Sequence, residues 1–111
     1  MKFFLTFLGN FDDFLRIMLI LIIIDYVSAI LSAIYNKTIS SSIGYKGIIK
    51  KIGIIFFISL SQQIDNLNIY EDTNIRYLVL SFFIFNEIFS ILENLKSLNL
   101  PVPDIFKNEE K

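Results

Sequence analysis

The chain has 111 residues, is 54% hydrophobic, carries a formal net charge of −1 and contains neither cysteine nor histidine. The missing cysteines exclude disulfides and thiolate chemistry, the missing histidines remove the commonest general base and metal ligand, and the balanced charge gives no basic excess for nucleic acid. We therefore predict no catalytic residue, no cofactor, no metal site and no nucleic-acid partner. The mean hydropathy of +0.61 is above that of a soluble domain of this size and predicts an all-α membrane protein.

Residues 1–16 predict a short N-terminal helix that the mature protein retains. The phenylalanines recur at helical spacing with polar residues opposite, which suits a helix lying in the membrane interface; a simple helical lead-in to the first span is the alternative. A cleaved signal peptide is disfavoured because Asp25 would lie inside its apolar core. The apolar stripe is Phe3, Phe7, Phe11 and Phe14, opposite Lys2, Thr6, Asn10 and Asp13.

The first predicted span covers about residues 15–35. Its core, Ile17–Tyr35, has 19 residues and one charge, Asp25, which is close to the roughly 20 apolar residues that cross a bilayer. A carboxylate at the centre of a span costs about 2.5 to 3.5 kcal/mol, so it must face protein, water or a partner. Ser28 and Ser32 fall on the same helix face as Asp25. Asp25 is therefore predicted to be functional.

The second predicted span covers about residues 47–64. Only 13 residues, Ile52–Ile64, lie between charges, which is about 20 Å of helix. The segment spans if Lys50 and Lys51 extend to the interface on their apolar stems, and it is re-entrant or interfacial otherwise. We favour spanning, and the sequence leaves open whether either lysine reaches Asp25.

The third predicted span covers about residues 76–94, and the polar tail covers residues 99–111. Asn86, Ser90 and Asn94 form a predicted seam on this span with Glu87 beside it. Such polar stripes either join helices to one another or face a water-filled lesion. The carboxyl groups of Asp25 and Glu87 favour the second interpretation. If neither has a cationic partner, each would be buried in its uncharged form in a compact state. The predicted functional polar residues are Asp25, Ser28, Ser32, Ser59, Gln63, Asn86, Glu87, Ser90, Glu93 and Asn94.

The connectors predict the orientation. The first connector and the start of the second segment carry only basic charge, whereas residues 65–76 carry three acids and Arg76. Lysine and arginine concentrate on the cytoplasmic side. We therefore predict three spans in a membrane domain of residues 1–98, with the N-terminus outside and the C-terminus in the cytoplasm. The lysines that set this topology are Lys37, Lys46, Lys50 and Lys51.

Three motifs resemble one known family. They are DYVSAILSA at Asp25–Ala33, SSSIGYKGIIKKI at Ser40–Ile52 and NEIFSILENLKSLNLPVP at Asn86–Pro103. Together with Asp65, they make the chain similar to the toxin-secretion/phage-lysis family of bacteriophage holins, which includes the clostridial toxin-release holins. Two departures are Ala29 and Asn99, at positions where the family often has glycine.

The resemblance implies a multi-pass protein of the bacterial cytoplasmic membrane that is not an enzyme. Its partners would be the lipid bilayer and further copies of itself, and its homo-oligomers would open large lesions that release an endolysin or a toxin. Two alternatives remain open, namely an antiholin and a small ion- or proton-coupled channel or transporter subunit. Gly- or Pro-interrupted helices are expected at the midplane of a transporter, and the first and third predicted spans contain neither residue.

Overall fold

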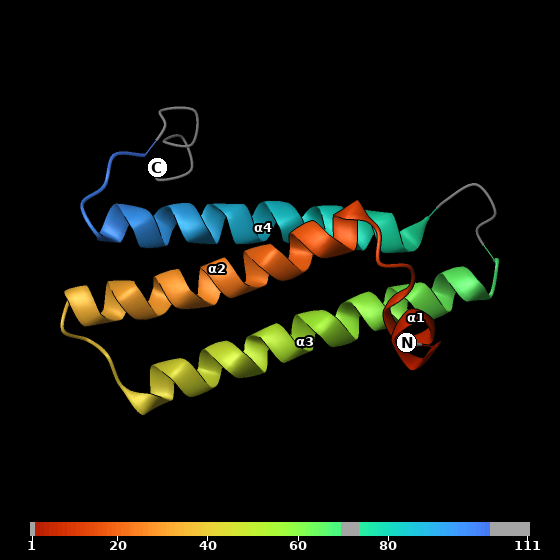
Figure 1. The fold of residues 1–111 in the computed structure, drawn as a ribbon, viewed down its shortest axis with the longest axis horizontal. Helices are drawn as coiled ribbons and strands as arrows, with labels where there is room; N and C mark the ends of the chain where they lie inside the picture. Colours follow the sequence, from red (N-terminus) through yellow and green to blue (C-terminus); the bar gives the residue numbers. More distant parts are fainter. Residues whose placement is uncertain (1, 70–73, 103–111) are drawn as a thin grey trace.

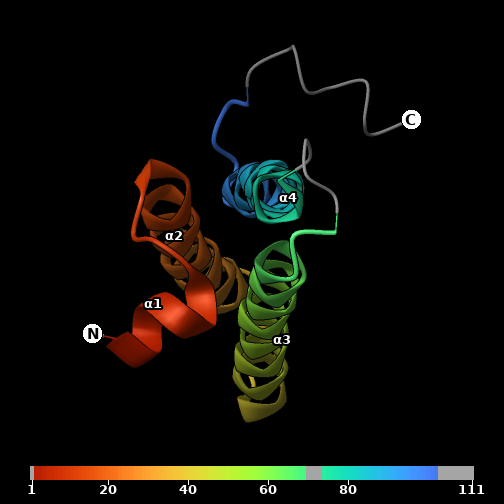
Figure 2. The same cartoon turned by 90° about the vertical axis from the view of Figure 1, so that its right-hand side faces the viewer.

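The computed structural model describes residues 2–69 and 74–102, which are helical apart from short connections and contain no strand. The helices are α1 (Lys2–Leu8), α2 (Asp13–Tyr35), α3 (Ser41–Asn66) and α4 (Ile75–Ser97). Figure 1 shows the three long helices side by side, each running opposite to the one before it in sequence. α1 lies across the axis of this bundle, near the start of α2 and the end of α3 (Figures 1 and 2).

Local capping explains where the long helices begin. The side chains of Asp12, Ser40 and Asn74 accept hydrogen bonds from the backbone N–H groups three residues later in α2, α3 and α4. Capping by such residues stabilises a helix by about 1 kcal/mol. Because Ser40 caps α3, this helix begins before the predicted segment 47–64, and it ends two residues after it.

Asn99, one of the two departures from glycine, lies just after the end of α4. This residue adopts a positive φ of 68°, and its N–H donates to the carbonyl of Lys96, while the N–H of Leu100 donates to that of Leu95. This pattern is the Schellman motif, in which asparagine is the usual substitute for glycine. The replacement of glycine therefore leaves the helix end intact. The tail beyond it, residues 103–111, lies outside the described residues.

The N-terminal segment is a separate helix, so the alternative of a continuous lead-in to the first span is wrong. Gly9 has a φ of +87°, a conformation that favours glycine and ends α1. Phe3 and Phe7 stack within α1, whereas Phe14 belongs to α2 and contacts Tyr77 of α4. The predicted aromatic stripe is thus divided among α1, the connection that holds Phe11, and α2.

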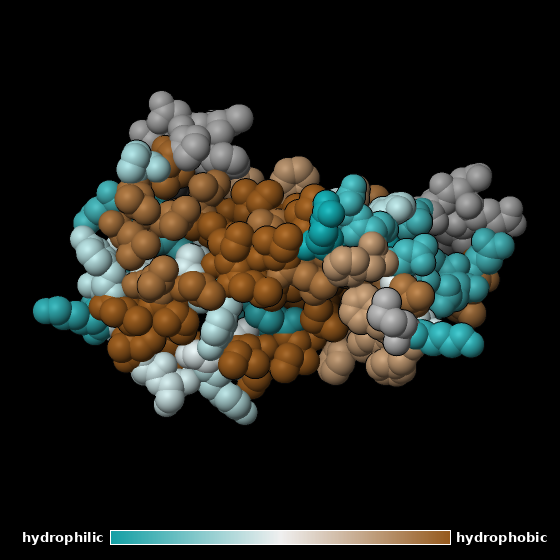
Figure 3. Space-filling view, viewed as in Figure 1, coloured by the Kyte–Doolittle hydropathy of each residue, from teal (hydrophilic) through white to brown (hydrophobic). Residues whose placement is uncertain are grey.

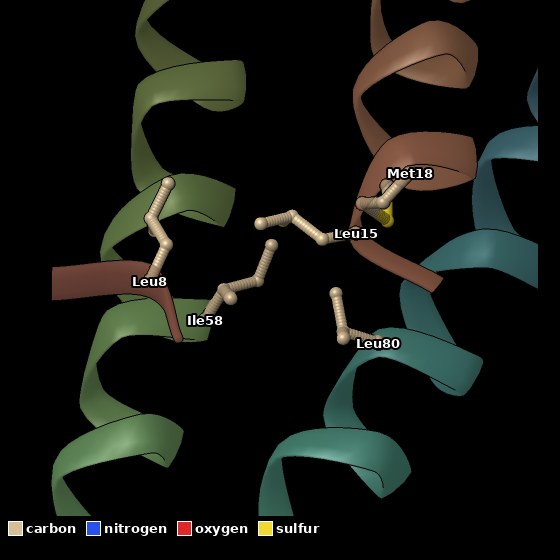
Figure 4. Packing of buried hydrophobic residues seen from close by; sticks show 5 residues of the cluster. All are labelled: Leu8, Leu15, Met18, Ile58 and Leu80. Carbon is tan, nitrogen blue, oxygen red and sulfur yellow. The ribbon is translucent and has the colours of Figure 1, made fainter. Parts of the chain in front are cut away.

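The core lies where α1 meets the three long helices. α2 and α3 both pack mainly on α4 and contact each other less. Figure 4 shows the five buried side chains of the core converging from all four helices: Leu8, Leu15, Met18, Ile58 and Leu80. Between α2 and α3, an apolar groove of about 460 Å³ remains, with Ile22, Ile48 and Ile55 among its lining residues.

The surface is that of a membrane protein. α2 and α4, each of 23 residues, are long and apolar enough to cross a membrane, at about 34 Å of helix each. Only 22% of the most apolar stretch of each of these two helices is buried, whereas the core helix of a soluble protein is mostly buried. Figure 3 shows a broad apolar band over the middle of the bundle, with hydrophilic residues gathered toward the ends. Such continuous exposed apolar surface marks a membrane contact.

Candidate functional site

Three charged side chains meet between the long helices, near the middle of their lengths. Lys51 of α3 donates from Nζ to Oδ2 of Asp25 on α2 and, over 2.8 Å, to Oε1 of Glu87 on α4. Asp25 and Glu87 are 4% and 2% exposed. We call Asp25, Lys51 and Glu87 the ionic triad. The sequence left open which lysine reaches Asp25, and the structure assigns that contact to Lys51.

Polar groups of α4 complete the surroundings of Asp25. Ser90 donates to Asp25 Oδ1 over 2.8 Å, and Asn94 Nδ2 donates to the same oxygen over 3.0 Å. The Asn94 amide also donates to Ser28 Oγ over 2.9 Å. Both oxygens of the Asp25 carboxylate are therefore occupied by donors, which is the condition under which a charge is tolerated away from water.

The ionic triad ties all three long helices together at one level. Two carboxyl groups share a single ammonium, so the triad is neutral only when one carboxyl carries a proton. Removing one partner of a buried ionic group costs about 3 to 5 kcal/mol, whereas replacing all partners by packed uncharged groups is often neutral or stabilising. Stability alone therefore does not require this arrangement, which instead has the properties of an element that holds one conformation.

Lys51 differs from its predicted role. We expected Lys50 and Lys51 to extend to the interface together, but the Lys51 side chain is only 19% exposed and points inward to the acids. Lys50 is exposed, as are Lys37 and Lys46. The sequence left open whether Asp25 and Glu87 have a cationic partner, and in the structure Lys51 supplies the cation to both.

The predicted seam on α4 divides between two faces. Ser90 and Asn94 reach Asp25, whereas Asn86 is exposed. A step of four residues turns an α-helix by 40° more than a full turn, so three residues at this spacing drift around it. Glu93, one residue before Asn94, is also exposed.

The remaining predicted residues lie outside the ionic triad. Ser32 Oγ donates to Ser97 Oγ over 2.7 Å at the end of α2 and α4, where the Asn36 amide joins them. Ser59 is buried in α3. Gln63 is exposed and donates from Nε2 to the carbonyl of Thr6 over 2.9 Å, which joins α3 to α1.

A second polar cluster, centred on Arg76, holds the N-terminal segment at the end of the bundle where α2 and α4 begin. The Arg76 guanidinium is buried and donates to the carbonyls of Leu8 and Asn10, each over 2.8 Å, and to Asp12 Oδ2 over 2.9 Å. Asp65 accepts from the N–H groups of Ile75 and Arg76. These contacts join the α1–α2 connection and the end of α3 to the start of α4.

The electrostatics of this cluster favour an ionised Asp12. Burial by itself raises the pKa of this carboxyl, but the hydrogen bonds from Arg76 and the Leu15 N–H and the positive charge of Arg76 together lower the pKa of Asp12 below its ordinary value of 3.8. The ion pair with Arg76 is therefore formed at neutral pH.

Sequence reasoning missed the role of Arg76. The available signal was that Arg76 is the one cation of residues 65–76, next to an apolar segment. An arginine at that position would have to find an anion or carbonyl groups to be buried. Its partners, Leu8, Asn10 and Asp12, lie more than 60 residues away in sequence, and no local pattern identifies them.

Comparison with known proteins gives a family and several relatives. The model of the bacteriophage holin family matches residues 2–110. Uncharacterized proteins of Listeria monocytogenes and Listeria innocua are each 36% identical over 100 residues, which are 90% of this chain and 71% of theirs. An uncharacterized 14.9 kDa protein of Clostridium perfringens is 33% identical over 103 residues, which are 93% of this chain and 78% of its own. No solved structure matches the chain.

Proposed function

Because this chain belongs to the bacteriophage holin family, we propose that it accumulates in the bacterial cytoplasmic membrane and then oligomerises into lesions. The lesions would let an endolysin reach the cell wall or, in a toxin-export setting, let a toxin leave the cell. Such a protein forms a pore and catalyses no reaction. The observation that carries the proposal is the ionic triad, a buried charged cluster that joins three helices whose outer surfaces are apolar.

The proposed topology has three spans, an outside N-terminus and a cytoplasmic C-terminus. α3 packs against both α4 and α2 and runs in the same general direction as they do in Figure 1, so it crosses the bilayer if they do. Lys50 and Lys51 were the two charges that argued against a membrane-spanning α3. Because Lys51 points inward to the acids, only Lys50 of the two remains as an exposed charge. The ends of α2 and α4 and the start of α3 lie at the same end of the bundle (Figure 1). Lys37 belongs to the α2–α3 connection and Lys46 to the start of α3, so the positive-inside rule favours this end as the cytoplasmic one. α1, lying across the bundle, then lies along the outer interface.

The ionic triad would act as the element that separates a compact state from an open one. In the compact state, Lys51 satisfies both carboxyl groups and holds the bundle closed. In a lesion, water would hydrate the same three groups, and this hydration would offset the loss of their mutual contacts. A net charge within the membrane also couples the two states to the membrane potential, at about 2.3 kcal/mol per elementary charge per 100 mV.

The test is inducible expression of the full chain in a bacterium that also produces a cytosolic endolysin without a signal peptide. Viability, membrane potential and endolysin release are followed in the same culture. Abrupt death at a fixed time, with lysis only when the endolysin is present, is the expected result. Lys51→Met disrupts the ionic triad and is expected to shift the time of death, whereas Lys50→Met, on the exposed side of α3, is the matched control.

Two other outcomes would replace the proposal. Continued growth with delayed killing by a co-expressed lesion-forming relative would identify an antiholin. Selective ion flux in living cells, without endolysin release, would identify an ion-coupled channel subunit.

A further inference from the structure

Beside the ionic triad, two glycines of α3 leave room for an aromatic ring of α2. The ring belongs to Tyr26, the residue after Asp25. A Cβ atom added at Gly47 would lie 3.0 and 3.1 Å from two ring carbons of Tyr26, and one added at Gly44 would lie 3.3 Å from its hydroxyl oxygen. The same hydroxyl donates to the carbonyl of Gly44 over 3.3 Å. We call the space that Gly44 and Gly47 leave for the ring the Tyr26 niche.

The Tyr26 niche and Lys51 lie along one face of α3. Gly44, Gly47 and Lys51 are separated by steps of three and four residues, which place them on the same side of a helix. A long side chain in a helix leans over the turn before its own Cα, which brings the Lys51 ammonium back toward the level of Gly47. The ring in the niche and the ammonium on Asp25 are thus two adjacent contacts between the same two helices.

The niche lies where little else holds α3 on α2. These two helices contact each other less than either contacts α4, and an apolar groove separates them, with Tyr26 and Lys51 among its lining residues. The core fixes α3 at Ile58, seven residues after Lys51. Gly47 lies four residues before Lys51, so the niche can fix the rotation of α3 on the other side of the triad.

The niche also explains why Lys51, rather than Lys50, is the cation of the triad. Consecutive residues of an α-helix point in directions about 100° apart, so Lys50 could take the place of Lys51 only if α3 turned by that angle. Ile43 and Lys46, each one residue before a glycine of the niche, would then face the Tyr26 ring. Their side chains would fill the space that the ring occupies.

We propose that Tyr26 is a positioning residue of the ionic triad, whose ring, seated in the niche, sets the rotation of α3 that directs Lys51 to Asp25. The ring carries this role, because the hydroxyl makes only one long hydrogen bond. The inference deepens the proposed function and rests on it only for the effect on lysis. Withdrawal of the ring would release Lys51 from Asp25 and favour the open state.

The test uses the full chain with 15N-labelled lysine in mild detergent micelles, where nuclear magnetic resonance detects an ammonium group that is shielded from water. The Lys51 signal, identified by its loss in Lys51→Met, is expected to persist in Tyr26→Phe, which keeps the ring. In Tyr26→Ala its exchange with water should become about tenfold faster, the effect of losing one charged hydrogen bond. Gly47→Val, which fills the niche, should act in the same way. Gly53→Val is the matched control, because a Cβ at Gly53 meets nothing within 4 Å.

A coupling measurement separates positioning from ordinary packing. If the ring acts through Lys51, Tyr26→Ala should lower the ratio of folded to unfolded protein several-fold less in a Lys51→Met background than in a Lys50→Met background. A ring that only packs against α3 would lower both ratios equally.

Three results would overturn the inference: no shielded Lys51 signal in the unsubstituted chain, a signal unaffected by both Tyr26→Ala and Gly47→Val, or equal losses in the two lysine backgrounds. Neither read-out depends on lysis. The expected signals and coupling in a protein that never kills cells would reject the proposed function and leave the role of Tyr26 standing. Lysis by a protein whose Lys51 signal is indifferent to Tyr26 would do the reverse.

Discussion

Lys51 Nζ lies 2.8 Å from Glu87 Oε1, and this contact joins the middle of α3 to the middle of α4. The same ammonium also donates to Asp25 of α2, so one cation connects every long helix of the bundle. In the proposed topology, a lysine placed in this way is a structural element of the membrane interior rather than a marker of the membrane surface. Its substitution should therefore affect the whole fold.

Replacing Lys51 with methionine is expected to lower the free energy of unfolding by about 3 to 5 kcal/mol, because two buried carboxyl groups lose their cation. Combining Lys51→Met with Asp25→Asn and Glu87→Gln should recover most of this loss, since no unpaired charge remains. Helical circular dichroism during titration with sodium dodecyl sulfate measures both effects in mild detergent micelles. Lys50→Met, on the exposed side of α3, is the control and should be close to neutral. Equal stability of the Lys51 and Lys50 variants would contradict the assigned role.

The amide variants of the two acids should change the time of lysis without preventing membrane insertion. Asp25→Asn and Glu87→Gln each leave Lys51 with one carboxylate, whereas the double variant leaves its charge unpaired. Asp25 accepts from Ser90 and Asn94 as well as from Lys51, so Asp25→Asn should shift the lysis time further than Glu87→Gln. Lysis curves at matched protein levels provide the measurement, with Ser61→Ala as the control because Ser61 bonds only within its own helix. Unchanged lysis timing in both single variants would contradict the proposal that the ionic triad separates the compact state from the open one.

Asn94→Leu should loosen α2 from α4. The variant loses the hydrogen bonds to Asp25 and Ser28 and leaves part of a buried carboxylate unsatisfied, which costs about 1 to 3 kcal/mol. Detergent unfolding measures the loss. Ser97→Ala removes a hydroxyl near the exposed helix end and should cost less, so the reverse order would argue against the polar contacts of Asn94.

Arg76→Gln should release the N-terminal segment while the ionic triad remains formed. The guanidinium contacts Leu8, Asn10 and Asp12 at once, and glutamine cannot make all three contacts. Proteolysis from the outer side of oriented membrane vesicles should then cut the connection between α1 and α2 several times faster. Arg16→Gln is the control, because the exposed ion pair of Arg16 with Asp13 lies within α2 and contributes little. Equal cleavage rates in the two variants would contradict the role of Arg76 in holding the N-terminal segment.

Acidification should release the same segment without substitution. The pKa of Asp12 is lowered in the folded protein, so the Asp12 contribution to stability is fully present above the ordinary value of 3.8 and is lost as pH falls through the lowered value. The cleavage rate of the α1–α2 connection should therefore stay constant from neutral pH down to pH 3.8 and rise below it. Asp12→Asn should remove this rise and give faster cleavage at neutral pH. A rise well above pH 3.8 would point to a different group.

Much of this protein follows from its sequence. Apolar runs longer than 15 residues are local features, so the positions of α2 and α4 could be predicted closely. The need of Asp25 and Glu87 for polar partners could also be predicted, because a carboxyl group inside an apolar helix needs a partner wherever that helix packs.

The tertiary structure alone decided which partners those groups have. Helical periodicity states which residues share a face but not which face meets a neighbour, so the sequence could not choose between Lys50 and Lys51 or separate the exposed Asn86 from the inward-facing Asn94. The contacts of Lys51 cross 26 and 36 positions and those of Arg76 cross 64 to 68. They depend on the rotation and relative height of packed helices, which side-chain packing sets only when the whole bundle has formed.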